Sequence, residues 1–167
     1  HHNEGRRVAR LKPRPNPDVN RWWICDPGRY GYSPIDAPSR ILSPRRRDGE
    51  ETIEIGWDEA VPLVAHRLRQ YRPTEIGVLA SPRMSNEDLF VLRRLTDHLG
   101  VPNVDFGVPP RTPGFEDGLL IKADKNPNTR GAELIGFLPR DGGLDASGML
   151  QAARARTLKC LWVFHHD

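Results

Sequence analysis

Cysteine is scarce in this sequence of 167 residues, which contains only Cys25 and Cys160. Because the two cysteines lie far apart and in different kinds of segment, we do not expect a disulfide framework of the sort that holds small secreted domains together. No apolar run approaches the roughly 20 residues that a membrane-spanning helix needs, and no signal-peptide pattern is present. The composition therefore predicts a soluble, cytoplasmic chain.

Two patterns of common enzyme classes are also missing. No Gly-x-Gly-x-x-Gly follows an expected strand, which weighs against direct binding of NAD. No Gly-x-Ser-x-Gly presents a nucleophilic serine, so hydrolase chemistry has no support. With 37% hydrophobic residues, the chain still has enough apolar material for the core of one domain of ordinary size.

The net charge of +3 hides an uneven distribution of charge. Residues 1–47 hold eleven Lys and Arg against four Asp and Glu, whereas residues 48–167 hold fourteen against eighteen. A basic segment of this kind needs an acidic neighbour or water around it. Nucleic acid is an alternative partner, but no recognition helix or RNA-binding motif accompanies the basic run at residues 45–47. A solvated turn is the simpler interpretation of that run.

The sequence divides into two predicted parts, residues 1–47 and residues 48–167. In the first part we expect short strands at residues 6–11 and 22–24, separated by a proline-rich extended arm. Residues 33–47 contain three prolines and no hydrophobic period, which predicts a linker.

The second part alternates between strand and helix patterns. Short apolar or alternating runs predict strands at residues 51–55, 75–80, 103–106 and 158–164. Residues that can cap a helix precede the apolar periods between these strands, and Gly100 is expected to end the second helix. The expected caps are Asp58, Ser85, Asn128 or Thr129, and Asp145 or Ser147. This alternation predicts an α/β fold.

The segment with the clearest chemistry surrounds Cys25. An aromatic pair, Trp22 and Trp23, precedes this cysteine, and Pro-Gly-Arg-Tyr follows one residue after it. We expect a buried thiol at the end of a short strand, with Gly28 supplying a tight turn and the guanidinium of Arg29 facing a negatively charged partner. Without such a context, a lone cysteine is more often a small buried apolar residue.

The pattern Asn-x-x-x-x-Cys-x-x-Gly-Arg-aromatic at residues 20–30, preceded by Arg-Leu-Lys-Pro-Arg at residues 10–14, resembles a segment of the molybdopterin oxidoreductases. The same segment occurs in their relative, the large iron–sulfur subunit (the G subunit) of bacterial NADH–quinone oxidoreductase, or complex I. Residues 57–60, 81–87, 126–132 and 158–167 resemble further stretches of this family in the same order.

The resemblance implies a parallel Rossmann-like sheet of the molybdopterin-oxidoreductase type, preceded by a small β-rich remnant of an iron–sulfur-binding lobe. In that family the segment carries the fourth cysteine ligand of a 4Fe–4S cluster, so Cys25 would be the metal ligand, with Arg29 beside the cofactor. The other three ligands form a Cys-x-x-Cys-x-x-x-Cys group about two dozen residues upstream, which would fall before His1. The resemblance thus implies a fragment in which the cluster is incomplete.

The loop at residues 106–114 separates enzyme from non-enzyme within the family. In formate dehydrogenases of this fold, the matching loop carries a Cys or selenocysteine that binds molybdenum, and Arg111 falls near that position. A guanidinium is always protonated and cannot bind a metal. The resemblance therefore implies that the chain has no catalytic residue and that molybdopterin is absent.

The function that follows from the resemblance is scaffold and electron relay in a respiratory NADH dehydrogenase complex. Its place would be the cytoplasmic, peripheral arm of an inner-membrane complex, with other iron–sulfur subunits as partners, no nucleic acid, and only indirect contact with the membrane. Two alternatives stay open. One is a fragment of the catalytic subunit of a molybdenum-dependent formate dehydrogenase or a related NAD-linked oxidoreductase, and the other is a basic nucleic-acid or partner-binding module.

Overall fold

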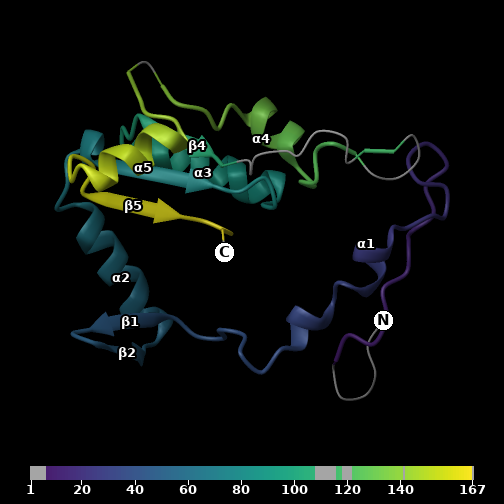
Figure 1. Ribbon diagram of the computed structural model, residues 1–167. Helices are drawn as coiled ribbons and strands as arrows, with labels where there is room; N and C mark the ends of the chain where they lie inside the picture. The colour runs from purple at the N-terminus through teal and green to yellow at the C-terminus, as the bar shows by residue number, and fades with distance from the viewer. Residues whose placement is uncertain (1–6, 108–115, 118–121, 141, 167) are drawn as a thin grey trace. The chain divides into compact units, whose positions relative to one another are not determined.

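The computed structural model describes residues 7–107, 116–117, 122–140 and 142–166 (Figure 1). The chain forms two compact units, one made of residues 1–60 with 111–125 and the other of residues 61–110 with 126–167. The described residues contain a two-stranded antiparallel sheet and a three-stranded parallel sheet. The predicted α/β class is confirmed.

The first unit contains short elements joined by irregular chain. Its elements before residue 55 are α1 (Asp26–Tyr30), the 3-10 helix η1 (Ser33–Asp36), β1 (Arg45–Asp48) and β2 (Glu51–Glu54). Neither of the strands predicted near the N-terminus forms, because residues 7–11 and 22–24 have no strand beside them among the described residues. A turn organises the chain between them instead, since the carbonyl oxygen of Asn16 accepts the N–H groups of Val19, Asn20 and Arg21.

The antiparallel sheet of this unit is the hairpin of β1 and β2. The strands pair Arg45 with Glu54 and Asp48 with Glu51, so the loop has two residues. Gly49 is the first of these and has a φ of 61°, the left-handed conformation that a two-residue hairpin loop requires. The strand predicted at residues 51–55 is confirmed. The linker predicted at residues 33–47 is wrong in part, since it contains η1 and β1.

The arginine run at residues 45–47 is a strand and not a solvated turn. Its partner strand is acidic, with Glu54 directly opposite Arg45. Arg46 also forms ion pairs with Asp48, at 3.9 Å, and with Glu59, at 3.5 Å. Carboxylates within the same hairpin and the helix after it therefore balance much of the positive charge of this run.

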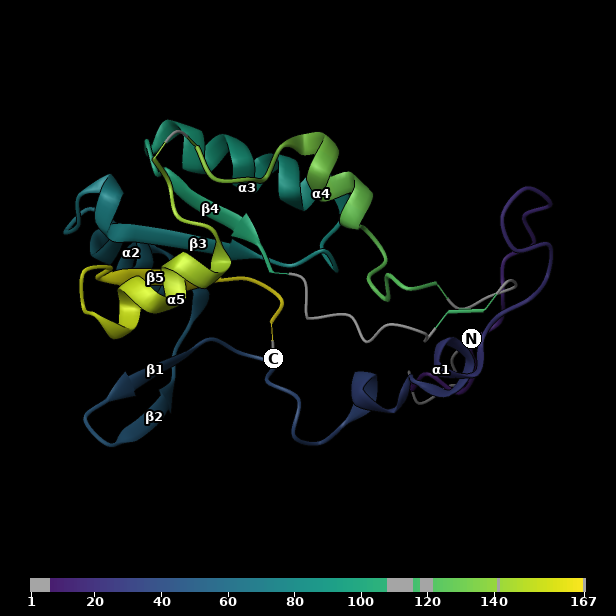
Figure 2. The same cartoon turned by 45° about the horizontal axis from the view of Figure 1, so that its top comes forward.

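The parallel sheet of the second unit has β3 (Ile76–Ala80) at its centre. It is flanked by β4 (Asn103–Phe106) on one side and β5 (Cys160–Val163) on the other (Figure 2). Both neighbours run parallel to β3, with Val78 beside Val104 and beside Trp162. The three predicted strands of this part are confirmed within one or two residues. As expected for a strand covered on both faces, β3 is almost fully buried.

Helices supply the remaining regular structure. They are α2 (Trp57–Leu68), which begins in the first unit, and α3 (Asn86–His98), α4 (Thr129–Ile135) and α5 (Ala146–Arg154) in the second. The predicted caps Ser85 and Asp145 are confirmed, because their side chains accept the N–H groups of Asp88 and Gly148. The prediction for Asp58 is wrong, since α2 already begins at Trp57 and the Gly56 carbonyl oxygen accepts the first helical N–H groups.

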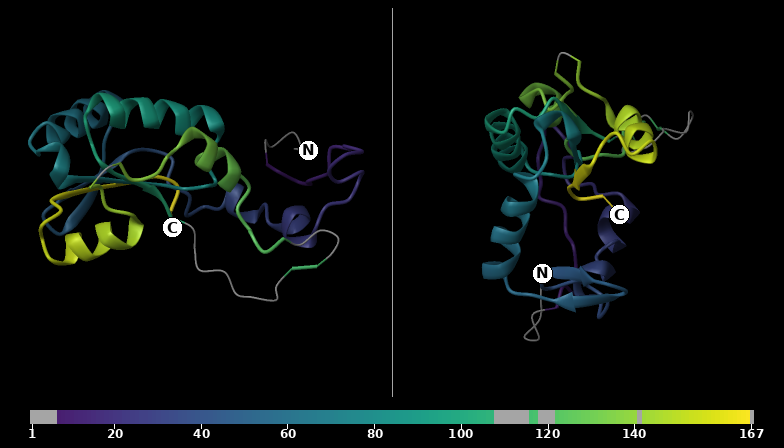
Figure 3. Two further views of the ribbon diagram at one scale, coloured as in Figure 1. Left: turned by 90° about the horizontal axis from the view of Figure 1, so that it is seen from above. Right: turned by 90° about the vertical axis from the view of Figure 1, so that its left-hand side faces the viewer.

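Two layers of helix enclose the parallel sheet. Helices α3 and α4 lie over one face and α5 lies over the other (Figures 2 and 3). On the first face, Ile76, Val78 and Ala80 pack with Leu89 and Leu92 of α3. On the second face, a Cβ added to Gly77 would lie 2.7 Å from the sulfur of Met149 in α5, so only glycine allows α5 to approach so closely.

The end of α3 shows how local sequence fixes these connections. Gly100 has a φ of 67° and follows the last helical turn, as predicted. Its N–H donates to Asp97, and the N–H of Val101 donates to Thr96, which is the Schellman arrangement that satisfies the last carbonyl groups of a helix. The chain then enters β4 within three residues.

Candidate functional site

Cys25 begins the short helix of the first unit. It is the N-cap of α1, with an extended backbone, and its carbonyl oxygen accepts the N–H of Arg29 at 2.9 Å. Pro27 stands in the first turn, where a missing N–H costs little. The predicted strand end with a tight turn at Gly28 is therefore wrong, because residues 26–30 form a helical turn and Gly28 has no positive φ.

The surroundings of this thiol are more open than the sequence predicted. Cys25 is half-buried, not buried. The aromatic side chains near it in sequence, Trp22, Trp23 and Tyr30, are 66%, 52% and 67% exposed. These rings are available for contact with another segment or another protein, as large amphipathic side chains at interfaces are.

Arg29 is half-buried and lies one helical turn after Cys25. Together with Arg10, Tyr30 and Tyr32 it lines a polar pocket of about 280 Å³. A permanent positive charge one turn from a thiolate ligand is the electrostatic environment that a net-negative cluster favours. Both site residues predicted from the sequence thus lie in the same helical turn.

The first unit contains a single thiol, that of Cys25, that could bind a metal. Within the described ranges, no group of three or more His, Cys, Asp or Glu side chains is placed so that it could hold a metal ion. A 4Fe–4S cluster takes about four thiolates. Cys25 fits one of these positions, and the other ligands would have to come from outside the described residues.

Cys160 offers a contrast to Cys25. It lies on β5, is half-buried, and packs beside the core of the second unit. Burial raises the pKa of this thiol. This apolar setting in a strand beside the core is typical of a structural cysteine. Both cysteines are free, in agreement with the expectation of no disulfide.

A polar network joins two separate stretches at the carboxyl end of β3. The side-chain amide of Asn128 donates to the carbonyl oxygen of Met84 at 2.9 Å and to Oδ1 of Asn86 at 3.0 Å. The N–H of Asn128 donates to the carbonyl oxygen of Pro82 at 2.9 Å. The sequence suggested Asn128 as a helix cap, but its side chain makes no capping bond and instead binds the loop after β3.

Gly131 belongs to the same network. A Cβ at this position would lie 2.1 Å from Oδ1 of Asn86 and 2.2 Å from Oδ1 of Asn128, well inside contact distance. The absence of a side chain therefore allows α4 to close against the start of α3. Residues 81–87 and 126–132, which carry much of the family resemblance, form this contact between segments more than 40 residues apart.

Two polar residues of β4 bind the start of α5. The side chain of Asn103 donates to the carbonyl oxygens of Thr74 and Ile76 and accepts the N–H of Leu144. Oδ2 of Asp105 accepts the N–H of Ala146 at 2.7 Å. Burial raises the pKa of the Asp105 carboxyl, and the N–H groups of Ala146 and Phe106 act against this shift.

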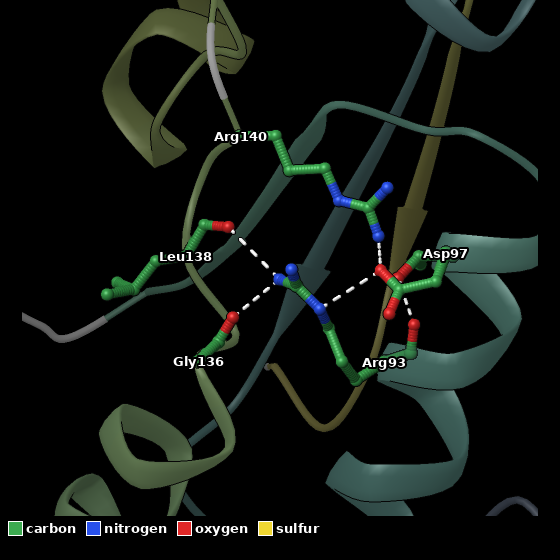
Figure 4. Close-up of polar contacts among 6 residues, drawn as sticks. Arg93, Asp97, Gly136, Leu138 and Arg140 are labelled. Atoms are coloured by element: carbon green, nitrogen blue, oxygen red, sulfur yellow. Dashed lines mark hydrogen bonds and ion pairs between the residues drawn. The ribbon is translucent and has the colours of Figure 1, made fainter.

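Arg93 of α3 holds the chain that follows α4 (Figure 4). Its guanidinium donates to the carbonyl oxygens of Gly136 and Leu138 and forms an ion pair with Asp97 at 3.1 Å. Arg140 forms a second ion pair with the same carboxylate. This cluster is structural, because its donors are directed at backbone carbonyl oxygens and at one carboxylate within the unit.

His166 lies at the carboxyl edge of the sheet. Its Nε2 is 2.8 Å from the carbonyl oxygen of Ala80, which requires a proton on that nitrogen. A Cβ added to Gly107, just after β4, would lie 3.1 Å from the His166 ring. The ring therefore spans the ends of β3 and β4. Apart from the polar character of Asn103, Arg93 and His166 in or beside apolar runs, nothing in the sequence predicted their roles.

The loop expected to separate enzyme from non-enzyme contains Arg111, which lies outside the described residues. The absence of a molybdenum ligand there stays a prediction from the sequence.

Comparison with known proteins gives two groups of relatives. No protein-family model matches the chain. The G subunit of NADH-quinone oxidoreductase from Rickettsia felis is 30% identical over 101 residues, which are 60% of this chain and 15% of that protein. The G subunit from Shewanella oneidensis is 36% identical over 101 residues, or 60% of this chain and 11% of that protein.

Formate dehydrogenases are similar as well. The F420-dependent formate dehydrogenase 1 subunit alpha of Methanococcus maripaludis is 34% identical over 76 residues, which are 46% of this chain and 11% of that protein. The chain thus spans 15% or less of the length of these three relatives. The resemblance inferred from the motifs is confirmed: the chain has homologues among the G subunits of NADH-quinone oxidoreductase and among the alpha subunits of formate dehydrogenase.

Proposed function

We propose that this chain is a non-catalytic scaffold and electron-relay part of an iron–sulfur subunit of the NADH–quinone oxidoreductase type. The observation that carries the proposal is the similarity to the G subunit over 101 residues in two bacteria. In this proposal residues 1–47 are the C-terminal part of a cluster-binding lobe with its linker. Residues 48–167 are the first part of an α/β domain of the molybdopterin-oxidoreductase type.

Cys25 would supply one of the four thiolates of a 4Fe–4S cluster in the complete protein. When bound, such a cluster accepts and passes on one electron at a time. Arg29 would place its charge beside the cluster and favour the reduced, more negative state. The exposed rings of Trp22 and Trp23 are suited to pack against the segment that brings the other ligands.

The test compares two cysteine variants in the complete gene product in which this sequence occurs. Cys25→Ser should remove about four iron atoms per subunit, with the matching sulfide and one electron paramagnetic resonance signal, because a serine oxygen is a poor substitute for thiolate. Cys160→Ser is the matched control, since Cys160 is also free and half-buried but has a raised pKa. It should leave iron, sulfide and spectrum unchanged.

Two outcomes would contradict this assignment. Full iron and sulfide content in the Cys25→Ser variant would show that Cys25 is not a ligand. Equal losses in both variants would show that the loss reflects general instability and not a missing ligand.

A formate dehydrogenase subunit is the second candidate. The similarity to the formate dehydrogenase alpha subunit supports it, although it covers a smaller share of the chain. The position of Arg111, a residue that cannot bind molybdenum, favours the first candidate. Elemental analysis of the purified complete protein separates the two, because a formate dehydrogenase of this kind should contain about one molybdenum per subunit and the proposed relay subunit none.

The partners proposed for the chain are other iron–sulfur subunits of a respiratory complex. The excess of Lys and Arg in residues 1–47 suits an acidic protein neighbour, and we propose no binding to nucleic acid. Among the described residues, no helix is both long and apolar enough to cross a bilayer. From the similarity to G subunits, we propose a cytoplasmic location in the peripheral arm of an inner-membrane complex, with only indirect membrane contact.

A further inference from the structure

Helix α2 carries the chain from one unit to the other. The chain crosses between the units at residues 60–61, 110–111 and 125–126. The second crossing lies outside the described residues and the third has no helix or strand, whereas the first lies inside α2. Among the described crossings, α2 is therefore the one whose stiffness can restrain movement between the units.

The two ends of α2 are held by different units. Arg46 of the hairpin forms an ion pair at 3.5 Å with Glu59 in the first turn of the helix. At the other end, Leu68 packs against the core of the second unit, as does Tyr71 just after the helix. The first turn of α2 is thus fixed to the hairpin and the last turn to the unit with the parallel sheet.

The middle of α2 receives little support from packing. No residue of this helix is buried, whereas α3 buries three of its side chains. Val61 is 59% exposed, and Pro62 beside it is exposed as well. Because most of the stability of a helix in a protein comes from the packing of its apolar face, the middle of α2 depends mainly on its own backbone hydrogen bonds.

Pro62 weakens these bonds inside the helix. Proline has no N–H, so the carbonyl oxygen of Asp58, four residues earlier, has no helical donor, and the proline ring crowds the same carbonyl group. A proline also disfavours the helical conformation of the residue before it, which is Val61. Sharp bends in helices occur mostly at such prolines. The weakest part of the α2 backbone therefore lies directly beside residues 60–61, where the chain crosses between the units.

We propose that α2 is a hinge that bends at residues 58–62 and lets the two units change their orientation while each keeps its own core. The first turn of the helix moves with the hairpin, and the last turn moves with the parallel sheet. Changes in a few backbone torsion angles are enough for a domain movement of this kind. The proposal does not depend on the electron-relay function, since it concerns only the backbone of one helix and the contacts at its ends.

Pulsed electron double resonance between two spin labels measures this movement in the full chain. Cys25 and Cys160 are first replaced by serine. One pair of labels is then attached at Thr52→Cys in the hairpin and Ser147→Cys in α5, which are exposed positions in different units. A second pair, His98→Cys with Ser147→Cys, lies within the second unit. The pair across α2 should give a clearly broader distribution of distances than the pair within one unit.

Pro62→Ala should narrow the distribution across α2, because alanine restores the missing N–H and favours a helix. Amide hydrogen exchange at residues 63–66 should also slow at least about tenfold, since proline destabilises the interior of a helix far more than alanine does. Pro73→Ala is the matched control. This proline is exposed as well, but it begins the 3-10 helix η2 (Pro73–Glu75), where a missing N–H costs little. The control should change neither measurement.

Three results would overturn this proposal. The wild-type distribution across α2 could be as narrow as the one within the second unit, which would show that the units do not move. Pro62→Ala could leave a broad distribution unchanged, which would place the bending elsewhere. The two proline variants could narrow the distribution equally, which would indicate a general gain in rigidity and not a hinge at Pro62.

Discussion

Replacing Gly131 by alanine tests the contact between the loop after β3 and α4. Alanine favours a helix over glycine by about 1 kcal/mol, so the change would stabilise α4 if nothing else moved. The new Cβ, however, would lie 2.1 Å and 2.2 Å from the side-chain oxygens of Asn86 and Asn128. Both side chains must rotate away, which breaks the two bonds that the Asn128 amide donates.

The magnitude follows from these opposing effects. Each lost hydrogen bond costs about 0.5–1.5 kcal/mol, and a carbonyl group left without a partner costs about 1–3 kcal/mol. Against a gain of about 1 kcal/mol in helix propensity, the two lost bonds and the carbonyl without a partner should lower the free energy of unfolding by about 1–5 kcal/mol. Urea denaturation followed by far-ultraviolet circular dichroism measures this loss.

A second helical glycine provides the control. Gly148 is the third residue of α5 as Gly131 is of α4, but its added Cβ would come no closer than 3.2 Å to Asp145 and 3.4 Å to Leu144. Gly148→Ala should therefore be neutral or slightly stabilising. In a chain that already carries Asn128→Ala, Gly131→Ala should cost less, because one of the two clashes and both bonds are gone. If Gly131→Ala is as stable as the wild type, or if the two losses simply add, the network does not hold α4 as described.

Three further changes test other parts of the chain. Arg93→Ala should lower the free energy of unfolding by about 2–4 kcal/mol, since the guanidinium binds two carbonyl oxygens and a carboxylate. Arg93→Lys should lose less stability than Arg93→Ala but still be less stable than the wild type, because lysine lacks the planar set of donors that arginine has. Urea denaturation measures both variants, and wild-type stability in Arg93→Lys would contradict this account. The raised pKa of Asp105 means that the folded chain binds this proton more tightly than the unfolded chain, so the contribution of Asp105 to stability is present below the unfolded pKa of about 3.9 and is lost as the pH rises through the folded pKa. Asp105→Asn should remove this part of the pH dependence of the free energy of unfolding, and an unchanged pH profile would refute the assignment. Single Arg→Ala changes at residues 45–47 should barely affect assembly with acidic partner subunits. Gln at both Arg45 and Arg47 should lower the yield of assembled complex and weaken the dependence of this yield on salt. Equal yields for the wild type and this double variant at low and at moderate salt would mean that the strand does not dock.

Neutral glutamine tests this strand better than a charge-reversing substitution. Reversing all three arginines to glutamate would place a carboxylate directly opposite Glu54 and remove the ion pairs of Arg46 with Asp48 and Glu59. Such a variant would weaken the hairpin itself, so a loss of assembly would have two explanations. Neutral glutamine at Arg45 and Arg47 changes the charge and keeps the Arg46 pairs.

The elements that the sequence predicted well are those with a local cause. A cap such as Ser85 or Asp145 and a stop such as Gly100 act within one helical turn, and the buried strand at residues 76–80 has a continuous apolar run. The strand predicted at residues 22–24 had β-favouring side chains but no partner strand among the described residues, and a proline two residues after Cys25 favours the start of a helical turn. Propensity without a partner did not produce a strand.

The contacts that the sequence did not predict join residues that are far apart along the chain. Asn128 binds Met84 across 44 positions, and Arg93 binds Gly136 across 43. Periodicity describes which face of an element is apolar, but it carries no information about which polar side chain will meet which carbonyl group of another segment. Such pairs follow from the packing of α3 against α4, which only the folded chain determines.

These long-range contacts also determine what the similarity to known proteins means. Residues 81–87 and 126–132 supported the family resemblance, and in the structure Ser85 caps α3, Asn128 binds Pro82 and Met84, and Gly131 makes room for both asparagines. These residues serve the fold, so they are expected in an electron-relay subunit and in a formate dehydrogenase alike, and both kinds of relative match the chain. Chemistry that distinguishes the two must come from residues with no such structural task. Cys25 is the first candidate, because its thiol is free and half-buried, and a test of whether it binds a cluster is therefore the decisive measurement.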